Sequence, residues 1–243
     1  MPGDGDDIEV RAGLETSSVD LRELDKTSLR LDAIHYAPSY RRTAEILKKS
    51  HLKTLPLGDY AARPLFTLGR FKRVYVRDSN HGYPYLAPYE LLNFKPFRER
   101  YLSKKLTEKA GGYFVKDGWL LLTSSGTIGV PVIATKEKEG YFLSHDLIRL
   151  VPKEDTPTGF LYAWLASKIA KPLFARQEYG GIIKHIEAHH VQNLPVPQLP
   201  IATTRSIDSK VRRAWALREE ANRLEEAAIL ELERSLDPPP NSP

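Results

Sequence analysis

The sequence predicts a mixed α/β fold, in which a globular domain with a β-rich core is followed by one long helix. The chain has 243 residues, of which 41% are hydrophobic, enough to bury a sizeable core. Short apolar runs separated by glycine and charged turns predict strands between residues 57 and 200. Apolar residues at intervals of three or four predict a helix over residues 204–236.

The two ends have compositions typical of disorder. Residues 1–10 are rich in glycine and acids, and residues 237–243 read DPPPNSP. We therefore expect disordered tails at 1–10 and 237–243, a globular domain at 11–200 and a separate helix at 204–236. The acidic start carries no signal peptide, no apolar run could span a membrane, and there is no cysteine. We expect a cytoplasmic protein without a membrane partner, disulfides or thiolate metal sites.

The first block of the domain, residues 11–56, contains one predicted helix. It runs from Ser39, as the N-cap, to Leu52. One face of this helix combines four residues at helical spacing. They are Tyr40, Ala44, Leu47 and His51.

The second block, residues 57–200, is predicted to be strand-rich. Residues 72–77 (KRVYVR) alternate basic with apolar or aromatic side chains, as in a half-buried strand. Four further runs, separated by turns, suggest a meander. They are Trp119–Thr123, Val130–Ala134, Tyr141–Ser144 and Leu147–Val151.

Two segments close this block. The 3–4 spacing of apolar residues predicts a helix over residues 157–171. Residues 194–200 (LPVPQLP) cannot be helical because of their prolines, so we expect a hinge before the last helix.

The last helix, residues 204–236, has Thr204 as its predicted N-cap. Its apolar stripe is narrow and its charges are mixed, which favours a partner helix in a coiled coil over packing on its own domain. The predicted interface residues are Ile207, Val211, Ala214, Leu217, Ala221, Leu224 and Ala228.

Positive charge is concentrated in one third of the chain. Residues 41–116 hold 17 Lys/Arg and 6 Asp/Glu, a net of +11, whereas residues 117–203 and 204–236 are each balanced. A local surplus favours a polyanion partner, although an ordinary solvated surface is the simpler alternative. We favour contact with DNA, because arginine and lysine interleave with aromatic residues here. The expected contacts are Arg70, Lys72, Arg73, Arg77, Arg98, Arg100, Lys104 and Lys105.

Two loops are further candidates for binding an anion. Residues 123–129 (TSSGTIG) could hold phosphate oxygens on backbone N–H and hydroxyl groups, but a tight β-turn is the favoured interpretation. Residues 177–185 (QEYGGIIKH) join two predicted helices, and their Gly-Gly turn either presents N–H groups to an anion or only caps a helix. The candidate residues are Ser124, Ser125, Thr127, Tyr179, Lys184 and His185.

Catalysis and metal binding are disfavoured. Ser144, His145 and Asp146 are consecutive, so on a strand they cannot form a nucleophile–base–orienter chain. His185 and His189 would share a helical face, but a third metal ligand is not evident. We expect no catalytic site, no metal and no cofactor.

Seven motifs occur in a characteristic order. They are Arg30–Ala33 (RLDA) followed by Tyr36 and Pro38, Gly82–Leu86 (GYPYL), Trp119–Gly129 (WLLLTSSGTIG), Leu143–Leu150 (LSHDLIRL), Gly159–Leu165 (GFLYAWL), Gly181–Ile186 (GIIKHI) and Leu194–Pro200 (LPVPQLP). This order, closed by a long charged helix, resembles the specificity (S) subunit of type I restriction–modification systems over residues 29–236. More narrowly, it is similar to one target recognition domain with its following conserved helix.

The resemblance implies a non-catalytic targeting function. Such a subunit reads half of a bipartite site in double-stranded DNA and positions an adenine methyltransferase (M) subunit, which uses S-adenosylmethionine. A nuclease–translocase (R) subunit is an optional further partner. The conserved helices of these subunits pair as an antiparallel coiled coil.

One departure from the family concerns domain number. A full specificity subunit has two recognition domains and two helices, whereas this chain has one of each. From Met1 and the proline-rich end we expect a natural half-subunit that self-associates through residues 204–236 and reads a palindromic bipartite site. The alternatives are a coiled-coil interaction protein whose basic domain binds RNA or protein, and an enzyme with an unrecognised site.

Overall fold

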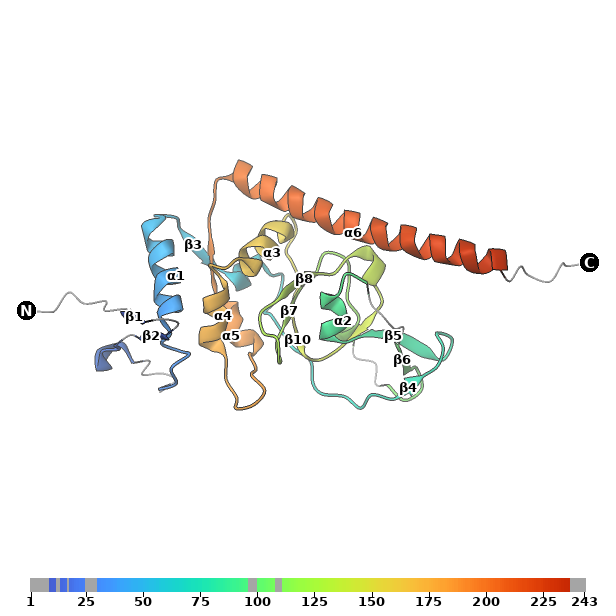
Figure 1. The fold of residues 1–243 in the computed structure, drawn as a ribbon, viewed down its shortest axis with the longest axis horizontal. Coiled ribbons are helices and arrows are strands. Elements are labelled where there is room, and N and C mark those ends of the chain that lie inside the picture. Colours follow the sequence, from blue (N-terminus) through green and yellow to red (C-terminus); the bar gives the residue numbers. More distant parts are fainter. Residues whose placement is uncertain are drawn as a thin grey trace, which may run out of the picture.

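The fold is a mixed α/β body with one long helix, α6 (Ile201–Leu236), lying along its upper side (Figure 1). The structure is a computed structural model that describes residues 9–11, 14–16, 18–24, 30–95, 100–107 and 111–236. The predicted fold class is therefore confirmed. Within the described residues, no helix has the length and apolar character needed to cross a membrane.

A small hairpin forms near the N-terminus. Strands β1 (Glu9–Arg11) and β2 (Leu14–Thr16) pair in antiparallel fashion. Glu9 and Val10 thus belong to a strand and not to the disordered tail predicted for residues 1–10. Their backbone groups pair with those of β2, and composition alone does not reveal such a pairing. Residues 1–8 and 237–243 lie outside the described residues. A short 3₁₀ helix, η1, follows at Leu21–Glu23.

Helix α1 (Pro38–Lys49) begins one residue before the predicted start. Pro38 occupies the first turn, where its missing N–H costs no hydrogen bond, so the predicted Ser39 cap is wrong. The helix ends before His51, whose φ of 55° is left-handed. Tyr40 and Leu47 pack against the main core as expected.

The proline-rich segment before α6 is part of the fold and not a free hinge. Strand β11 (Pro195–Pro197) pairs in antiparallel fashion with β3 (Thr54–Pro56). The indole N–H of Trp164 also donates to the carbonyl of Pro195 at 2.9 Å. Prolines lack an N–H, but their carbonyls still accept hydrogen bonds, and this allows the short pairing.

A three-stranded sheet forms the centre of the domain, with strand order β10-β7-β8. It contains β7 (Leu120–Thr123), β8 (Pro131–Ile133) and β10 (Leu147–Leu150), all close to their predicted ranges. The predicted meander is wrong, because the run at 141–144 becomes β9 (Phe142–Leu143), which joins a second sheet.

The second sheet has the order β4-β6-β5-β9. Strands β5 (Gly82–Leu86) and β6 (Arg100–Ser103) pair in antiparallel fashion, and β9 pairs with β5 in parallel. The predicted strand at 72–77 is reduced to β4 (Tyr75–Val76). Its partner β6 ends at Ser103, so Lys72 and Arg73 have no paired strand among the described residues. The remaining short elements between residues 57 and 138 are η2 (Leu57–Tyr60), α2 (Pro88–Leu92), η3 (Gly111–Tyr113) and η4 (Lys136–Lys138).

The predicted helix at 157–171 is two helices, α3 (Thr158–Ala166) and α4 (Lys171–Gln177). Ser167 separates them in an extended conformation, and its hydroxyl accepts a hydrogen bond from the Ala170 N–H at 3.1 Å. A serine side chain that binds the backbone in this way competes with the helix.

Helix α6 begins at Ile201, directly after Pro200, so Thr204 lies inside the helix and is not its cap. Its first half packs along α3. The Asp208 carboxylate accepts hydrogen bonds from the N–H groups of Gly159 (2.7 Å) and Phe160 (3.3 Å), which caps α3 from a different element. Gly159 is required here, because a Cβ would lie 2.6 Å from the Asp208 carbonyl oxygen.

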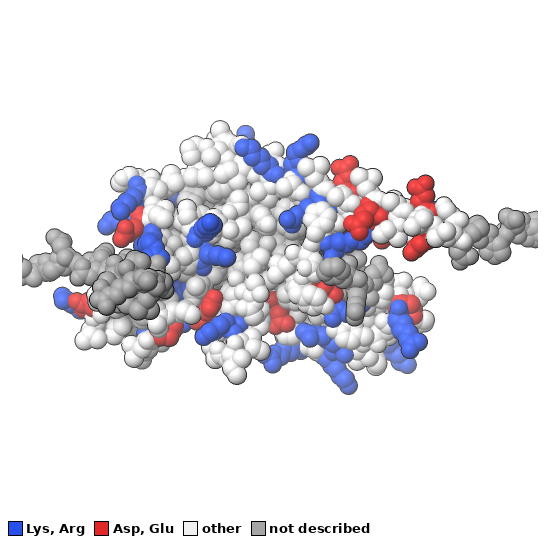
Figure 2. All heavy atoms as spheres, viewed as in Figure 1, with Lys and Arg blue, Asp and Glu red and all other residues white. Residues whose placement is uncertain are grey.

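The charge of α6 changes sign along its length. Residues 201–218 hold five Lys/Arg and one Asp, whereas residues 219–236 hold six Glu and two Arg. Figure 2 shows basic residues over the half that covers the domain and acidic residues along the half that extends to the right.

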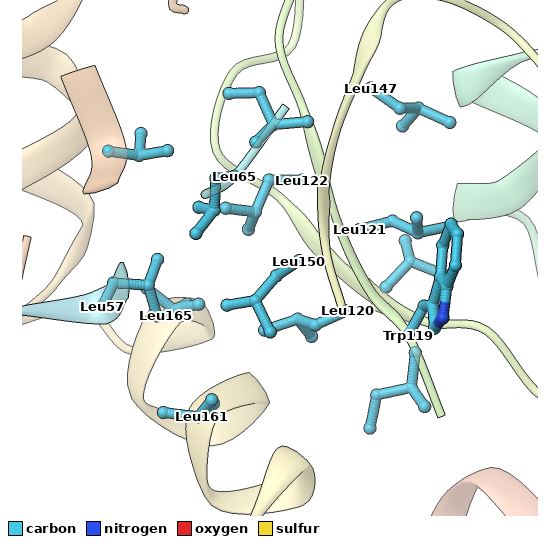
Figure 3. Close-up of a cluster of buried hydrophobic side chains, with 14 of the residues drawn as sticks. Leu57, Leu65, Trp119, Leu120, Leu121, Leu122, Leu147, Leu150, Leu161 and Leu165 are labelled. Carbon is cyan, nitrogen blue, oxygen red and sulfur yellow. The ribbon is translucent and has the colours of Figure 1, made fainter. Parts of the chain in front are cut away.

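The main core is rich in leucine and is covered on both faces of the central sheet. All four residues of β7 are buried. Figure 3 shows Leu120 and Leu122 on the side of α3, and Leu121 beside Trp119. A second, aromatic cluster lies within the four-stranded sheet and its neighbours, and its buried members are Tyr85, Leu102, Tyr113 and Phe142.

Candidate nucleic-acid interface

The two loops selected from the sequence lie side by side in the structure. Ser125 and His185 form an isolated β-bridge. The Gly126 N–H donates to the Lys184 carbonyl at 3.1 Å, and the Ile186 N–H donates to the Ser124 carbonyl at 3.0 Å. Two segments more than 50 residues apart in sequence therefore form one surface.

The segment between α4 and α5 (Ala188–Gln192) is a hairpin-like loop. Tyr179 and His185 exchange two backbone hydrogen bonds, at 3.0 and 2.8 Å, and this pairing closes the loop. Gly180 has a φ of +98°, and a Cβ there would lie 2.7 Å from the Ile183 carbonyl oxygen. The predicted helix start at the Gly-Gly turn is wrong, because this pairing holds the backbone until α5 begins at Ala188.

The loop at 123–129 is a tight connection between β7 and β8. The Gly129 N–H donates to the Thr123 carbonyl at 2.8 Å, and the Val130 N–H donates to the Thr123 hydroxyl at 3.0 Å. Ser124 is buried, whereas Ser125 is half-buried and Thr127 is exposed. Ser125 and Thr127 are therefore the more accessible of the three predicted contacts, and Ser124 is nearly enclosed.

A polar cavity of about 360 Å³ lies beside the joined loops. It opens between residues 67–70, the 145–146 turn and residues 185–187, and Arg70 lines it together with Ser124. The structure thus brings one of the predicted basic contacts next to the loop-based ones.

Tyr179 has its hydroxyl proton already committed. The hydroxyl donates to Glu187 Oε1 at 2.6 Å, and this hydrogen bond raises the pKa of Tyr179 to about 12. The hydroxyl oxygen of Tyr179 can therefore only accept a hydrogen bond from a nucleic acid, and the ring can still contact one.

The predicted basic contacts differ in their surroundings. Arg70, Lys72, Arg77 and Lys105 are exposed, and Figure 2 shows basic residues along the lower edge below β4 and β6. Arg73, also exposed, lies 3.7 Å from Asp146 and stacks over Phe71, so it joins the second sheet to the 145–146 turn. Arg98 lies outside the described residues.

Arg100 and Lys104 have structural partners. Arg100 Nη2 lies 2.6 Å from the carboxylate of Glu90, which is only 2% exposed. Removing Arg100 would leave a buried carboxylate without its counterion, which makes this arginine part of the fold. Lys104 donates to the carbonyls of Ser79 (3.0 Å) and Asn80 (3.1 Å) and so fastens the turn after β4.

Ser144 and His145 bind the same carboxylate, that of Asp146. The Ser144 hydroxyl donates to Oδ2 at 3.0 Å, and His145 Nε2 lies 3.4 Å from Oδ1. Burial lowers the pKa of His145, although the charge of Asp146 opposes this effect. The histidine does not touch the serine as a general base would, and this geometry gives no nucleophilic triad.

The other histidines do not combine into a metal centre. His185 lies in the loop closure and His189 lies on α5, so they do not share a helical face. No group of three or more potential metal ligands occurs in the described part of the chain.

Arg149 on β10 is a positioning residue that the sequence reasoning missed. It is fully buried, and its guanidinium donates to the carbonyls of Leu147 (2.8 Å) and Ser144 (2.9 Å). Burial lowers its pKa to about 10. The arginine therefore fixes the 145–146 turn at the cavity. A lone arginine in an otherwise apolar strand (LIRL) was the available signal.

The predicted helical stripe divides into two surfaces. Ile207 and Val211 pack against the chain's own core, which corrects these two interface predictions. Trp215, absent from the predicted stripe, is buried on the same face. The other five residues, Ala214, Leu217, Ala221, Leu224 and Ala228, are exposed. A repeat of 3.5 residues drifts around a straight helix of about 3.6 residues per turn, so one stripe cannot stay on one face.

A family match decides the assignment. Residues 69–208 match the type I restriction modification DNA specificity domain. The chain belongs to this family. The matched range contains both loops, every predicted basic contact and the cavity lining except for Thr67 and Leu68, and it ends at Asp208 on α6. The family is defined by DNA specificity and not by a reaction, in agreement with the predicted targeting function.

Solved structures with similar folds include three from type I systems. One comes from a study of complex assembly and conformational transition of the type I R-M system (15% identity, TM-score 0.48, covering 81% of this chain and 50% of that chain). The HsdS subunit from Thermoanaerobacter tengcongensis has 13% identity and a TM-score of 0.47, covering 81% of this chain and 50% of that chain. The S subunit from M. genitalium has 15% identity and a TM-score of 0.42, covering 76% of this chain and 43% of that chain. The chain thus spans about half the length of these proteins. No curated protein matches.

Proposed function

We propose that this chain is a DNA sequence-specificity subunit of a type I-like restriction–modification complex in the cytoplasm. It would bind one half-site of double-stranded DNA and position an adenine methyltransferase subunit, which carries S-adenosylmethionine. The observation that carries this proposal is the joining of the 123–129 and 179–185 loops beside Arg70, within the matched specificity domain. Figure 1 shows the 179–185 loop on the opposite side of the body from α6, so DNA and a helical partner need not compete.

Different residues would serve affinity and specificity. The exposed cations Arg70, Lys72, Arg77 and Lys105 suit phosphates, which attract charge without regard to sequence. Ser125, Thr127, Tyr179, Lys184 and His185 lie on the joined loops and suit base edges or the sugar–phosphate backbone. Arg73, Arg100, Lys104 and Ser124 would support this surface through the contacts described above. Arg98 remains a predicted contact.

The first experiment is co-purification of the chain from its native cell, with its partners identified by mass spectrometry. We expect an adenine methyltransferase at stoichiometric level, in some preparations with a nuclease–translocase subunit, and methylome sequencing would then give the DNA target. Recovery of a different enzyme, or binding of RNA in preference to duplex DNA, would instead support the coiled-coil interaction protein.

Substitution of the exposed cations tests the DNA-facing surface. Lys72→Ala and Arg77→Ala should weaken binding to all duplexes alike, each lowering the slope of log affinity against log salt by about 1. Lys168→Ala is a matched control, because Lys168 is exposed but lies between α3 and α4. Equal affinity and equal salt dependence in all three variants would show that DNA binds to another face.

We also propose that two copies associate through the exposed stripe of α6. In an antiparallel pair, the basic half of each helix lies beside the acidic half of the other. The charges of the two helices therefore attract each other at both ends of the pair. Leu217 and Leu224 are 50% and 66% exposed, and Ala221 between them is small enough to allow close approach of a second helix. Such a dimer carries two recognition domains related by a two-fold axis and would read a palindromic bipartite site.

Light scattering during size-exclusion chromatography measures this association. Leu224→Glu should shift the chain from dimer to monomer, whereas Leu31→Glu, at a leucine 77% exposed away from α6, should not. A wild-type chain that stays monomeric when bound to the methyltransferase would contradict the pairing.

A further inference from the structure

Two adjacent isoleucines form the tip of the loop between α4 and α5. Ile182 is fully exposed, and it is the most exposed large apolar side chain in the described part of the chain. Ile183 beside it is 57% exposed. Exposed apolar side chains that occur together mark contact sites more often than single ones do.

The tip is held in place from both sides. At its entry, the Arg30 guanidinium donates to the carbonyls of Arg176 (3.1 Å) and Glu178 (2.5 Å) at the end of α4. At its exit, the bridge between His185 and Ser125 ties the loop to the 123–129 turn. Lys184 also donates to the Gly180 carbonyl at 2.8 Å across the loop. The isoleucines are thus presented by a fixed loop, which lowers the entropy lost when a partner is bound.

The chemistry around the tip suits DNA. Lys184 follows the two isoleucines, and Arg70 lines the cavity that also contains His185. Of the two nearby carboxylates, Glu187 accepts the Tyr179 hydroxyl, and partial burial raises the pKa of Glu178. Cationic groups beside the tip can hold phosphates, whereas the isoleucine side chains have no polar atom and cannot hydrogen-bond a phosphate. On a duplex, the apolar surfaces open to them are thymine methyl groups, the faces of base steps and the deoxyribose carbons, and of these only the first two depend on sequence.

We propose that Ile182 and Ile183 contact base pairs of the target and determine part of its sequence. This inference rests on the proposed function and deepens it, because it assigns sequence reading to apolar contacts at one loop tip. The neighbouring polar residues then fix the position of the loop on the backbone.

Selection from a random duplex library tests the proposal. The full chain with its co-purified methyltransferase is incubated with duplexes that carry a randomised central segment, and the bound fraction is sequenced. The double variant Ile182→Ala/Ile183→Ala is compared with wild type and with Ile201→Ala. Ile201 is the matched control, because it is 67% exposed but lies at the start of α6.

We expect wild type and Ile201→Ala to enrich the same motif. The double variant should lose preference at one or two adjacent base pairs and keep the rest of the motif. Its affinity for the wild-type motif should fall about 10-fold, as expected for loss of one good base contact, while its affinity for a scrambled duplex stays within about 2-fold. Its Tm should match that of wild type, because both isoleucine side chains are exposed and their removal leaves no cavity in the core.

Three results would overturn the proposal. An unchanged motif in the double variant would show that the tip does not read bases. A uniform loss of affinity for every duplex would show a general contact and not a specific one. A clearly lower Tm would show that the isoleucines pack on the chain itself. Absence of any motif with wild type is a different result, because it would reject the proposed function as well.

Discussion

The two halves of α6 belong to one continuous helix but have opposite surroundings. The first half packs against α3 and the main core, buries Trp215 and caps α3 through Asp208. The second half carries leucines and one isoleucine that remain exposed, among them Leu224, Ile229 and Leu232. Its side-chain contacts with the described part of the domain are polar, such as Arg223 with Glu137 at 3.5 Å.

This difference teaches that helix propensity and helix packing are separate properties. Both halves contain good helix formers, so the backbone continues without a break. Among the described residues, only the first half meets a complementary apolar surface of the same chain, whereas the apolar residues of the second half remain exposed. Substitutions along the helix should therefore have effects on stability that decrease from the first half to the second.

The largest effect is expected for Trp215→Ala. The indole is 8% exposed and packs edge-on against Tyr162, with ring centroids 5.6 Å apart. Its removal leaves a cavity between α6 and α3, and we expect the free energy of unfolding to fall by about 3–5 kcal/mol. Urea denaturation measures this loss. Leu217→Ala, two residues later and half-exposed, is the control; equal losses in the two variants would contradict the division of the helix.

A smaller effect is expected for Asp208→Ala. The variant removes the acceptor of two N–H groups at the start of α3 and the partner of Arg212, which lies 2.8 Å away. Loss of a helix cap costs about 1–2 kcal/mol. Hydrogen exchange should show faster exchange at the first turn of α3 than in wild type. Unchanged exchange there would mean that this carboxylate does not cap the helix.

Glu219→Gln probes the boundary between the two halves. The Glu219 carboxylate accepts hydrogen bonds from Lys138 (2.6 Å) and Thr135 (2.7 Å), and both charged side chains are mostly buried. The amide keeps part of this hydrogen bonding but loses the charge, so we expect a loss of about 1 kcal/mol by urea denaturation. High salt should reduce the difference between variant and wild type only slightly, because buried pairs are weakly screened.

The smallest effect on the folded monomer is expected for Leu224→Ala. At protein concentrations where the chain is monomeric, the free energy of unfolding should change by no more than about 0.5 kcal/mol. At higher concentrations wild type should gain stability from self-association, and the variant should gain less. A large loss in the dilute monomer would show that the second half also packs on its own domain.

Prediction from sequence succeeded where local pattern and structure agree. The central strands fall close to their predicted ranges because short apolar runs such as WLLLT, bounded by turn residues, favour buried strands. The helix of residues 204–236 was predicted because its periodicity extends over many turns. The candidate loops were found because glycine and hydroxyl residues interrupt apolar runs, and the structure joins them through Ser125 and His185.

Prediction failed where long-range contacts override local pattern. Residues 194–200 looked like a hinge, but they pair with β3, which comes from the first block of the chain. Arg100 looked like a DNA contact, but the buried carboxylate of Glu90 requires it as a counterion. In the same way, the spacing of Ile207 and Val211 gave no sign of which face of α6 meets the domain.

The sequence by itself determined the mixed fold, the long terminal helix, the concentration of positive charge and the resemblance to a specificity subunit. These properties depend on composition, periodicity and motif order, which are written along the chain. Only the tertiary structure decided which cations are free, that two distant loops form one surface, and which side of α6 remains exposed. The physical reason is that burial and pairing depend on neighbours in space, and strands that pair across more than 100 residues, such as β3 and β11, leave no local trace of their partner.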